Sequence, residues 1–208
     1  MVRDARGHRA LRSRARGLST LFAAETWRAF EMDATDMRAL QRFYEENPEY
    51  SRLVEGEPPG PDAAQKEFDA MPPAEWPLKK KWIIGFRDAE GELIAMADLL
   101  EDLFVAGVWH LGLFIVATRL HGRGVGRQLY GALERWVRER GGKWCRLGVV
   151  VGNARAERFW PQCGYREVRM RLAVPYGRKV NDIRVMVKPL AGGRLNDYLQ
   201  AVARDRPE

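Results

Sequence analysis

The sequence predicts a single domain of the α/β (α+β) class, and three observations favour it. A length of 208 residues suits one domain with a buried core. Two apolar runs, 108–116 and 145–151, lack the alternation of a half-exposed strand, which is typical of strands buried on both faces. A glycine-rich turn follows the first run and leads into an amphipathic segment at 127–140, which gives the order strand, turn, helix.

The N-terminal part predicts a strand followed by a helix. Residues 26–32 can form the strand. Asp33 or Thr35 can cap a helix that runs to about residue 46 with its apolar residues on one face. Asn47-Pro48 ends this helix, because the residue before a proline disfavours the helical conformation.

The next part predicts a short helix and a strand hairpin. A Pro/Gly loop at 55–62 leads into the helix at 61–71, which starts at a proline placed where helices tolerate one. An apolar strand at 81–87 is followed by a turn at 88–91 and by a second strand at 92–100.

The remaining elements follow the glycine-rich turn. The helix at 127–140 ends at Gly141-Gly142, since glycine permits a left-handed residue there. After the strand at 145–151, Asn153 caps a short helix that Pro161 should kink or shorten. The strands at 166–174 and 182–188 close the domain as an antiparallel pair.

The formal net charge of +7 is concentrated at one end of the chain. The first 16 residues hold six arginines against one aspartate, so the rest of the chain is close to neutral. We therefore expect residues 1–18 to be a basic, disordered tail, 19–190 to form the folded domain and 191–208 to be a C-terminal extension. Binding of nucleic acid through the tail stays an alternative, but the near-neutral body makes it the weakest one.

Patterns for membrane insertion, secretion and metal binding are missing from the sequence. No run approaches the roughly 18 apolar residues of a membrane helix, and the N-terminus lacks the apolar stretch of a secretory signal. The two cysteines, Cys145 and Cys163, are too few for a disulfide framework and do not have metal-site spacing. We expect a cytoplasmic protein with no bound metal and no membrane partner.

The stretch from His121 to Gly126, which reads His-Gly-Arg-Gly-Val-Gly, is the most informative motif. Its glycines permit a sharp turn and leave the backbone N–H groups uncovered, and the next helix directs its own free N–H groups to the same place. Such a turn binds phosphate or pyrophosphate. The dinucleotide pattern G-x-G-x-x-G and the P-loop pattern G-x-x-x-x-G-K-S/T require spacings that this stretch lacks.

A second motif lies downstream at a matching separation. Asn153, Ala156, Trp160, Gly164 and Tyr165 fit the pattern N-x-x-A-x-x-x-Y-x-x-x-G-F/Y, except that Trp160 replaces the tyrosine. The glycine-rich turn fits Q/R-x-x-G-x-G/A, with a histidine in the first place. With both motifs in this order, residues 109–165 resemble the GNAT superfamily of acyl-CoA-dependent N-acyltransferases, and the likeness extends more weakly over about 26–190.

This resemblance implies a mixed central sheet flanked by helices, whose two middle strands, near 108–116 and 145–151, splay apart. It also implies that acetyl-CoA is the co-substrate and that it occupies the gap, with its pyrophosphate at the N–H groups of 122–127. The cofactor-binding residues that we expect are Phe114, Val116, His121, Gly122, Arg123, Gly124, Val125, Gly126, Arg127, Asn153 and Trp160.

The catalytic groups that we expect are a hydrogen-bond donor for the developing oxyanion and a base for the ammonium. By the resemblance, the donor is the backbone amide of Phe114. His110 is the expected base, because it lies eleven residues before His121, where some branches of the superfamily place a Glu or His. On a regular strand, His110 would share a face with Phe114 and Val116. An imidazole pKa of ~6.5 suits proton removal near neutral pH.

The acceptor side and the proton donor are less sharply defined. Asp98, Glu101 and Asp102 stay alternative bases. Tyr44, Tyr50, Asp98 and Glu101 come from segments that border the substrate in this architecture, and acid near a cleft favours a cationic amine. Trp160 stands where the family has a tyrosine, and an indole N–H does not serve as a proton source.

The sequence therefore predicts an N-acetyltransferase that passes an acetyl group from acetyl-CoA to an amine of a small molecule or peptide by direct attack. The missing phenol at Trp160 supports an alternative, a catalytically weak acyl-CoA-binding module with a sensor or scaffold role. Homodimers are frequent in the superfamily, so a homodimer is also expected from the resemblance.

Overall fold

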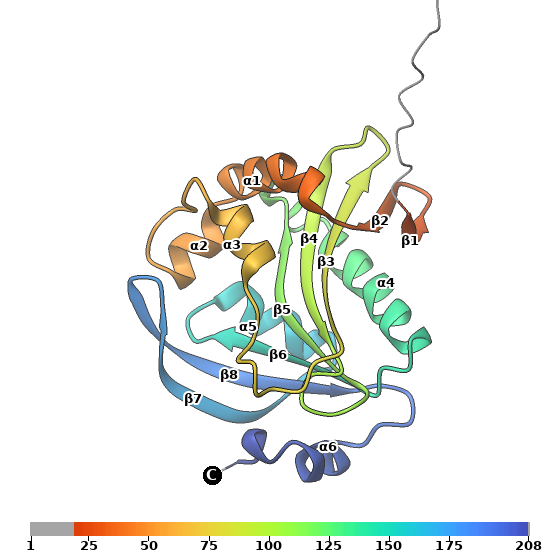
Figure 1. Cartoon of the computed structure of the whole chain (residues 1–208), viewed down its shortest axis with the longest axis vertical. Coiled ribbons are helices and arrows are strands. Elements are labelled where there is room, and N and C mark those ends of the chain that lie inside the picture. The colour runs from red at the N-terminus through yellow and green to blue at the C-terminus, as the bar shows by residue number, and fades with distance from the viewer. Residues whose placement is uncertain (1–18, 208) are drawn as a thin grey trace, which may run out of the picture.

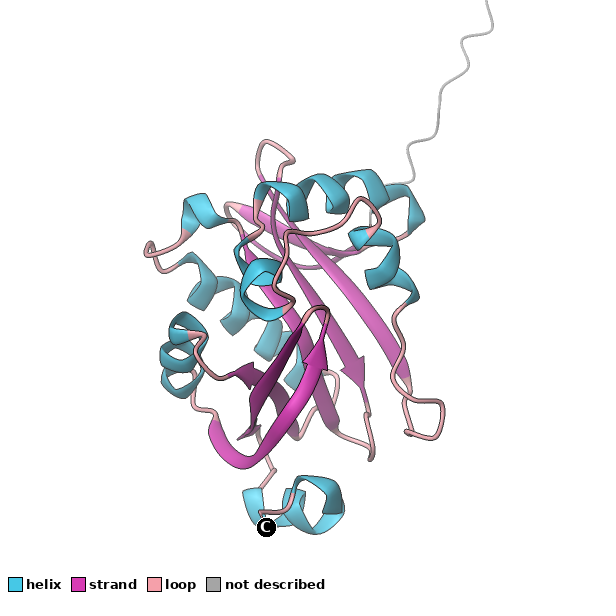
Figure 2. Ribbon diagram, turned by 90° about the vertical axis from the view of Figure 1, so that its left-hand side faces the viewer, coloured by secondary structure: helices cyan, strands magenta, loops and turns pink. Residues whose placement is uncertain are grey.

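The computed structural model describes residues 19–207, and the predicted tail at 1–18 lies outside the described residues (Figure 1). Within this range, one eight-stranded mixed sheet carries helices on both faces, which confirms the predicted fold class (Figures 1 and 2). The strand order is β1-β2-β3-β4-β5-β6-β8-β7. The strands are β1 (Thr20–Ala24), β2 (Trp27–Glu31), β3 (Lys80–Asp88), β4 (Leu93–Glu101), β5 (Val108–Val116), β6 (Trp144–Val150), β7 (Arg166–Tyr176) and β8 (Lys179–Pro189). The helices are α1 (Met37–Glu46), α2 (Glu49–Val54), α3 (Ala63–Asp69), α4 (Val125–Glu139), α5 (Ala154–Gln162) and α6 (Leu195–Ala201).

Two elements in the N-terminal part were not predicted. Strand β1 folds back on β2 through a two-residue turn and forms one edge of the sheet. Helix α2 begins directly after Pro48, so the proline that ends α1 also stands at the start of the next helix. Asp33, one of the two predicted caps, caps a 3-10 turn at Ala34–Asp36 that leads directly into α1, and its side chain accepts a hydrogen bond of 2.8 Å from the Thr35 N–H. Helix α1 itself begins after Asp36.

Alternation along the strands divides the core between the two faces of the sheet. Ile84 packs with the apolar stripe of α4, which includes Leu133 and Trp136. Its neighbour Ile83 packs on the opposite face with α1, through residues such as Leu40. Helix α4 therefore covers one face, and α1 and α3 cover the other (Figure 1).

The two middle strands separate halfway along their length, which confirms the predicted splay. Strand β5 pairs with β6 in parallel only from Val108 with Trp144 to Leu111 with Leu147. Beyond these pairs, Gly112 of β5 and Gly148 of β6 are both exposed. The gap that opens between the strands is thus bordered by residues without side chains.

A β-bulge in β5 lies at the start of this gap. The pairing of β4 with β5 shifts between Asp98 and Leu99, so that Gly112 is an extra residue without a partner in β4. The bulge changes which residues of β5 share a face. Leu111 packs toward α4 before the bulge, and Phe114 packs toward α4 after it.

The C-terminal segment is tied into the sheet by a buried carboxylate. Asp205 is fully buried and accepts hydrogen bonds from Arg146 at 2.6 and 3.1 Å, from Arg171 at 3.0 Å and from the Tyr198 hydroxyl at 2.5 Å. These bonds outweigh the effect of burial and lower the pKa of Asp205 to about 2. The described part of the predicted extension, residues 191–207, thus supplies the carboxylate that pairs with the buried Arg146 of β6.

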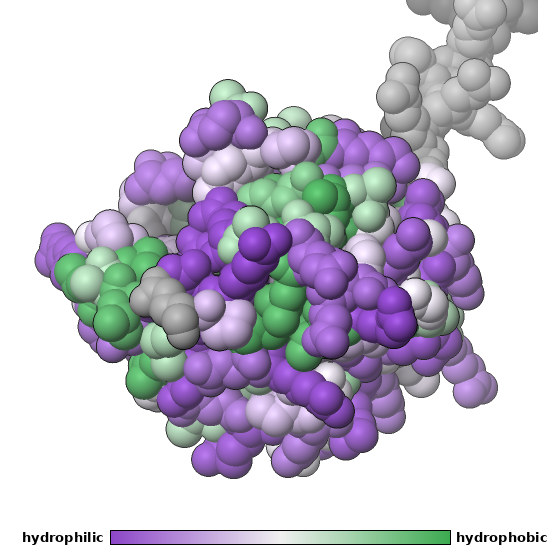
Figure 3. Space-filling model, turned by 90° about the horizontal axis from the view of Figure 1, so that it is seen from below, coloured by the Kyte–Doolittle hydropathy of each residue, from purple (hydrophilic) through white to green (hydrophobic). Residues whose placement is uncertain are grey.

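The hairpin of β7 and β8 reaches back to the loop after α2. The Arg178 N–H donates to the Glu55 carbonyl at 2.8 Å, and the Asn181 side chain donates to the Val54 carbonyl at 2.9 Å. Seen from below, an apolar patch lies over this hairpin, where Leu172 and Val180 are exposed (Figure 3). Within residues 19–207, no helix combines the length and apolar character needed to cross a bilayer.

Candidate active site

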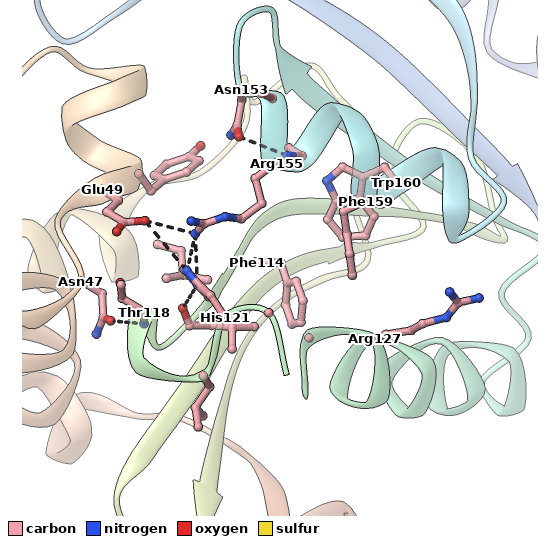
Figure 4. Close-up of a pocket in the computed structure, with 18 of the residues that line it drawn as sticks. Asn47, Glu49, Phe114, Thr118, His121, Arg127, Asn153, Arg155, Phe159 and Trp160 are labelled. Carbon is pink, nitrogen blue, oxygen red and sulfur yellow. Dashed lines mark hydrogen bonds and ion pairs between the residues drawn. The ribbon is translucent and has the colours of Figure 1, made fainter. Parts of the chain in front are cut away.

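A cavity of about 630 Å³ lies between α2, the end of β5, the glycine-rich turn, the start of α4 and α5 (Figure 4). Two of the predicted cofactor-binding residues do not line it: Arg123 is exposed on the turn, and Val125 packs against the core beneath it. The predicted residues that do line it are Tyr50, Phe114, Val116, His121, Gly122, Gly124, Gly126, Arg127, Asn153 and Trp160.

The glycine-rich turn presents uncovered main-chain N–H groups to this cavity. Gly122 and Gly124 have φ angles of +75° and +78°, and a Cβ added to either would meet no atom within 4 Å. Within residues 19–207, the N–H groups of 122–126 make no hydrogen bond, and no side chain caps the N-terminus of α4. The turn therefore fits a pyrophosphate group, because its free donors and the helix dipole point at open space.

The edge of β5 also turns hydrogen-bonding groups toward the cavity. The Ala117 N–H donates to the Ile94 carbonyl of the β4 side at 2.8 Å. In an antiparallel pair, alternate residues bond to the partner strand, so the N–H groups of Phe114 and Val116 point away from β4, toward the gap. An extended pantetheine arm fits along this edge as a substitute strand partner.

His121 is tied to this edge. Its Nε2 lies 2.8 Å from the Val116 carbonyl oxygen and donates to it, while Nδ1 faces the Arg155 guanidinium. Arg155 in turn pairs with Glu49 at 3.1 Å, which links α5 to α2 across the cavity (Figure 4). Sequence reasoning missed Glu49 and Arg155, because α2 was not predicted and nothing in the sequence brings residues so far apart together.

Aromatic side chains form the wall beside α5. The Trp160 ring is buried, with its centroid 6.1 Å from that of Phe114 and 4.8 Å from that of Phe159. Tyr165 faces the core, where its hydroxyl lies 3.0 Å from that of Tyr130. Asn153 caps α5 as predicted, by accepting from the Ala156 N–H at 3.1 Å. Tyr50 is the tyrosine that lines the cavity within the described chain.

The predicted face for His110 is wrong. Because Gly112 is bulged, His110 lies on the face opposite to Phe114, where its Nδ1 is 3.2 Å from both the carbonyl oxygen and Nη1 of Arg146. Burial, followed by the charge of Arg146, lowers the pKa of His110 to about 3. His110 does not line the cavity. A glycine inside a strand is the feature of the sequence that signals such a bulge.

Asp98 lies beside Gly112 at the start of the gap, and it is not one of the residues that line the cavity. Its Oδ2 is 3.1 Å from the position that a Cβ would take on Gly112, and Oδ1 is buried with no hydrogen-bond partner among residues 19–207. Glu67 of α3 and Lys81 of β3 are its charged neighbours. Burial and the charge of Glu67 raise the pKa of Asp98 to about 7, although Lys81 acts in the opposite direction.

Tyr44 and Glu101, two other residues predicted on the acceptor side, are engaged by neighbouring side chains. Tyr44 is buried and donates to the Oε2 of Glu67 at 3.1 Å. Glu101 lies away from the cavity, where it accepts from Lys79 at 2.6 Å and from Trp82 at 2.8 Å. Burial opposes its ionisation, but these two hydrogen bonds outweigh burial and lower the pKa of Glu101.

Within residues 19–207, no group of three or more His, Cys, Asp and Glu side chains is arranged to hold a metal ion. The features of the site are instead a row of free N–H groups at a turn, a strand edge with unpaired donors and a carboxylate at the point where the two strands part. This arrangement suits an extended, pyrophosphate-bearing ligand that runs from the turn along the edge of β5 toward the gap.

Comparisons with known proteins agree with this geometry. Residues 35–165 match the Acetyltransferase (GNAT) family. A search of curated sequences finds no significant match. Solved structures that resemble the chain include spermidine N-acetyltransferase from Vibrio cholerae in complex with CoA and spermine, with a TM-score of 0.62 and 17% identity over 81% of this chain and 98% of that one.

Two further solved structures have the same fold. An acetyltransferase from Thermus thermophilus matches with a TM-score of 0.59 and 22% identity over 82% of this chain and 99% of that one. The ribosomal-protein-S18-alanine N-acetyltransferase from Escherichia coli matches with a TM-score of 0.58 and 17% identity over 82% and 97%. From the family match and the fold together, the chain belongs to the GNAT acetyltransferase family, the family of acetyl-CoA-dependent N-acetyltransferases.

Proposed function

We propose that the protein transfers an acetyl group from acetyl-CoA to an amine of a small molecule or peptide by direct attack, with Asp98 as the base. One observation carries this proposal: the Asp98 carboxylate lies against the exposed Gly112, where β5 parts from β6 and the edge of β5 offers the free N–H of Phe114. Gly112, which the base contacts, and Phe114, which carries the donor, are thus two residues apart on β5.

The N–H groups of 122–126 would hold the pyrophosphate, and the N–H groups of Phe114 and Val116 would bind along the extended arm. When bound, acetyl-CoA supplies an activated acetyl thioester. The Phe114 N–H is available to donate to a carbonyl oxygen in the gap, and a fixed main-chain donor of this kind stabilises a developing oxyanion. Phe159 and Trp160 keep water from the wall beside α5.

Asp98 would accept the proton that an ammonium group must lose before it can attack. The raised pKa, about 7, suits this task, since the carboxylate is then more basic than a free one and still ionises near neutral pH. His110 is not proposed for this role, because its Nδ1 is engaged by Arg146 and its pKa is lowered to about 3 by burial and by the charge of Arg146.

The acceptor would enter from the face that α1 and α3 cover, beside the β7–β8 hairpin. Tyr44 and Tyr50 border that side. Two of the similar structures are by name a spermidine N-acetyltransferase and a ribosomal-protein-S18-alanine N-acetyltransferase, so polyamines and peptide amines are the first acceptors to test. The cytoplasmic location and the homodimer expected from the sequence stay part of this proposal.

A thiol-release assay with acetyl-CoA tests the proposal across polyamines, amino acids, aminoglycosides and peptides. We expect turnover with at least one amine and loss of it in Asp98→Asn. Saturable binding of acetyl-CoA without turnover for any amine would instead favour a sensor or scaffold module. That alternative rests on Trp160, whose indole cannot act as the proton donor that a phenol supplies.

A further inference from the structure

We propose that Glu67 and Lys81 are positioning residues that tune the proton affinity of Asp98 in opposite directions. The inference rests on the proposed role of Asp98 as the base. It gives a functional role to one residue of helix α3 and one of strand β3, and neither element contributes a side chain to the lining of the cavity.

Lys81 is held between the two carboxylates by its main-chain partners. Its side chain is 8% exposed, and its Nζ donates to the carbonyl oxygens of Glu67 at 2.5 Å and Ala70 at 2.7 Å. In this position Nζ lies 3.7 Å from the Oδ2 of Asp98 and 3.8 Å from the Oε1 of Glu67. The ammonium is thus fixed near both acids, and the side chain cannot leave without losing two hydrogen bonds.

The charge of the cluster favours one retained proton. Two ionised carboxylates and one ammonium would leave a buried excess of negative charge, which a single shared proton removes. Asp98 and Glu67 have side chains only 16% and 15% exposed, and Oδ1 of Asp98 has no donor among residues 19–207. Other titratable groups also face the pair. The Tyr44 hydroxyl of α1 donates to Glu67 and therefore carries its own proton, and Tyr50 and Glu55, of α2 and its C-terminal end, lie close enough to Glu67 to interact with its charge.

The reaction starts from the form of the cluster in which both carboxylates are ionised, and the proton transfer from that form balances. An N–H bond of the acceptor ammonium breaks, an O–H bond forms on Asp98, and the nitrogen keeps the electron pair with which it attacks. With this proton on Asp98, the two carboxyl groups and the Lys81 ammonium carry no net charge, and later loss of the proton to water restores the carboxylate.

This arrangement predicts opposite responses to two substitutions. Glu67→Gln removes a neighbouring negative charge, so Asp98 should hold its proton less tightly and titrate at lower pH. Lys81→Gln removes the positive charge, so Asp98 should titrate at higher pH. Each shift should reach about one pH unit or more, which is the usual effect of a charge at this separation. Asp69→Asn, an exposed carboxylate two residues along α3, is the matched control and should shift nothing.

Carbon-13 NMR of aspartate carboxyl groups in the protein without cofactor measures these shifts directly, with Asp98→Asn to assign the signal. A downward shift in Glu67→Gln supports the inference. An unchanged or upward shift in a folded Glu67→Gln variant overturns it, even if Lys81→Gln does not fold. The acidic limb of the kcat/KM profile against pH should move in the same directions.

Failure of the inference and failure of the proposed function give different results. If no amine is turned over but the two NMR shifts appear with opposite signs, the proposed function fails and the electrostatic coupling stands. If turnover depends on Asp98 but Glu67→Gln leaves both the NMR titration and the pH profile unchanged, the proposed function stands and the role of Glu67 is refuted.

Discussion

Replacing Asp98 by asparagine should make the protein less active and, above neutral pH, more stable. Asparagine has nearly the shape of a protonated aspartic acid and never ionises. Removal of a positioned general base lowers kcat/KM by about 10²- to 10⁴-fold. The limb of the kcat/KM profile that rises through a pH of about 7 should disappear with it, since it reports ionisation of Asp98.

The stability effect follows from the same pKa. The folded protein raises the pKa of Asp98 from 3.8 to about 7, so it binds this proton more tightly than the unfolded chain does. The contribution to stability is therefore full below the unfolded pKa and is lost as the pH rises through the folded pKa. A shift of three units corresponds to at most about 4 kcal/mol, at about 1.36 kcal/mol per unit. Asp98→Asn does not lose stability in this way as the pH rises, because asparagine does not ionise.

Urea unfolding of the wild type and of Asp98→Asn at about pH 4 and about pH 8 measures the difference. The free energy of unfolding of the variant minus that of the wild type should increase from the lower to the higher pH, by up to about 4 kcal/mol. Asp69→Asn, exposed on α3, should follow the wild type. A variant that is less stable than the wild type at the higher pH, or one that keeps full activity, would refute the reasoning.

Two further predictions concern the buried polar groups below the gap. His110→Ala should leave the pH profile of kcat/KM in place, because the pKa of His110 is about 3; disappearance of the acidic limb in a steady-state assay would restore His110 as the base. Asp205→Ala should lower the free energy of unfolding by about 3–5 kcal/mol in urea denaturation, because Arg146 is then left buried without its partner. The exposed Asp197→Ala should cost less than about 1 kcal/mol, and equal costs for the two variants would contradict the ion-pair account.

Much of the fold could be predicted from the sequence, because the patterns that determine these elements lie within short stretches of the chain. The unbroken apolar runs at 108–116 and 145–151 predicted the two central strands within a residue at each end, and Asn153 predicted the start of α5. The glycine-rich turn predicted a break between strand and helix, and Gly122 and Gly124 indeed have positive φ angles there. In these cases the residues themselves restrict the backbone, so the pattern and the structure carry the same information.

The parts that sequence reasoning missed depend on contacts between distant residues. Strand β1 forms only because β2 offers it an edge, and α2 is a helix of only 6 residues, too short to show a helical period. The bulge at Gly112 moved His110 to the other face, and strict alternation could not foresee this reversal. Glu67 went unnoticed because its importance comes from Lys81 and Asp98, which lie on two other elements.

Calorimetric titration with CoA tests the central claim, that the N–H groups of the glycine-rich turn hold the cofactor. Gly124→Trp places a bulky side chain over these donors, and Gly141→Trp is its matched control, because Gly141 also has a positive φ and open space but lies at the far end of α4. We predict that the wild type and Gly141→Trp bind CoA alike and that Gly124→Trp binds at least about tenfold more weakly. Absence of binding by the wild type, or equal affinity in all three proteins, would contradict the account.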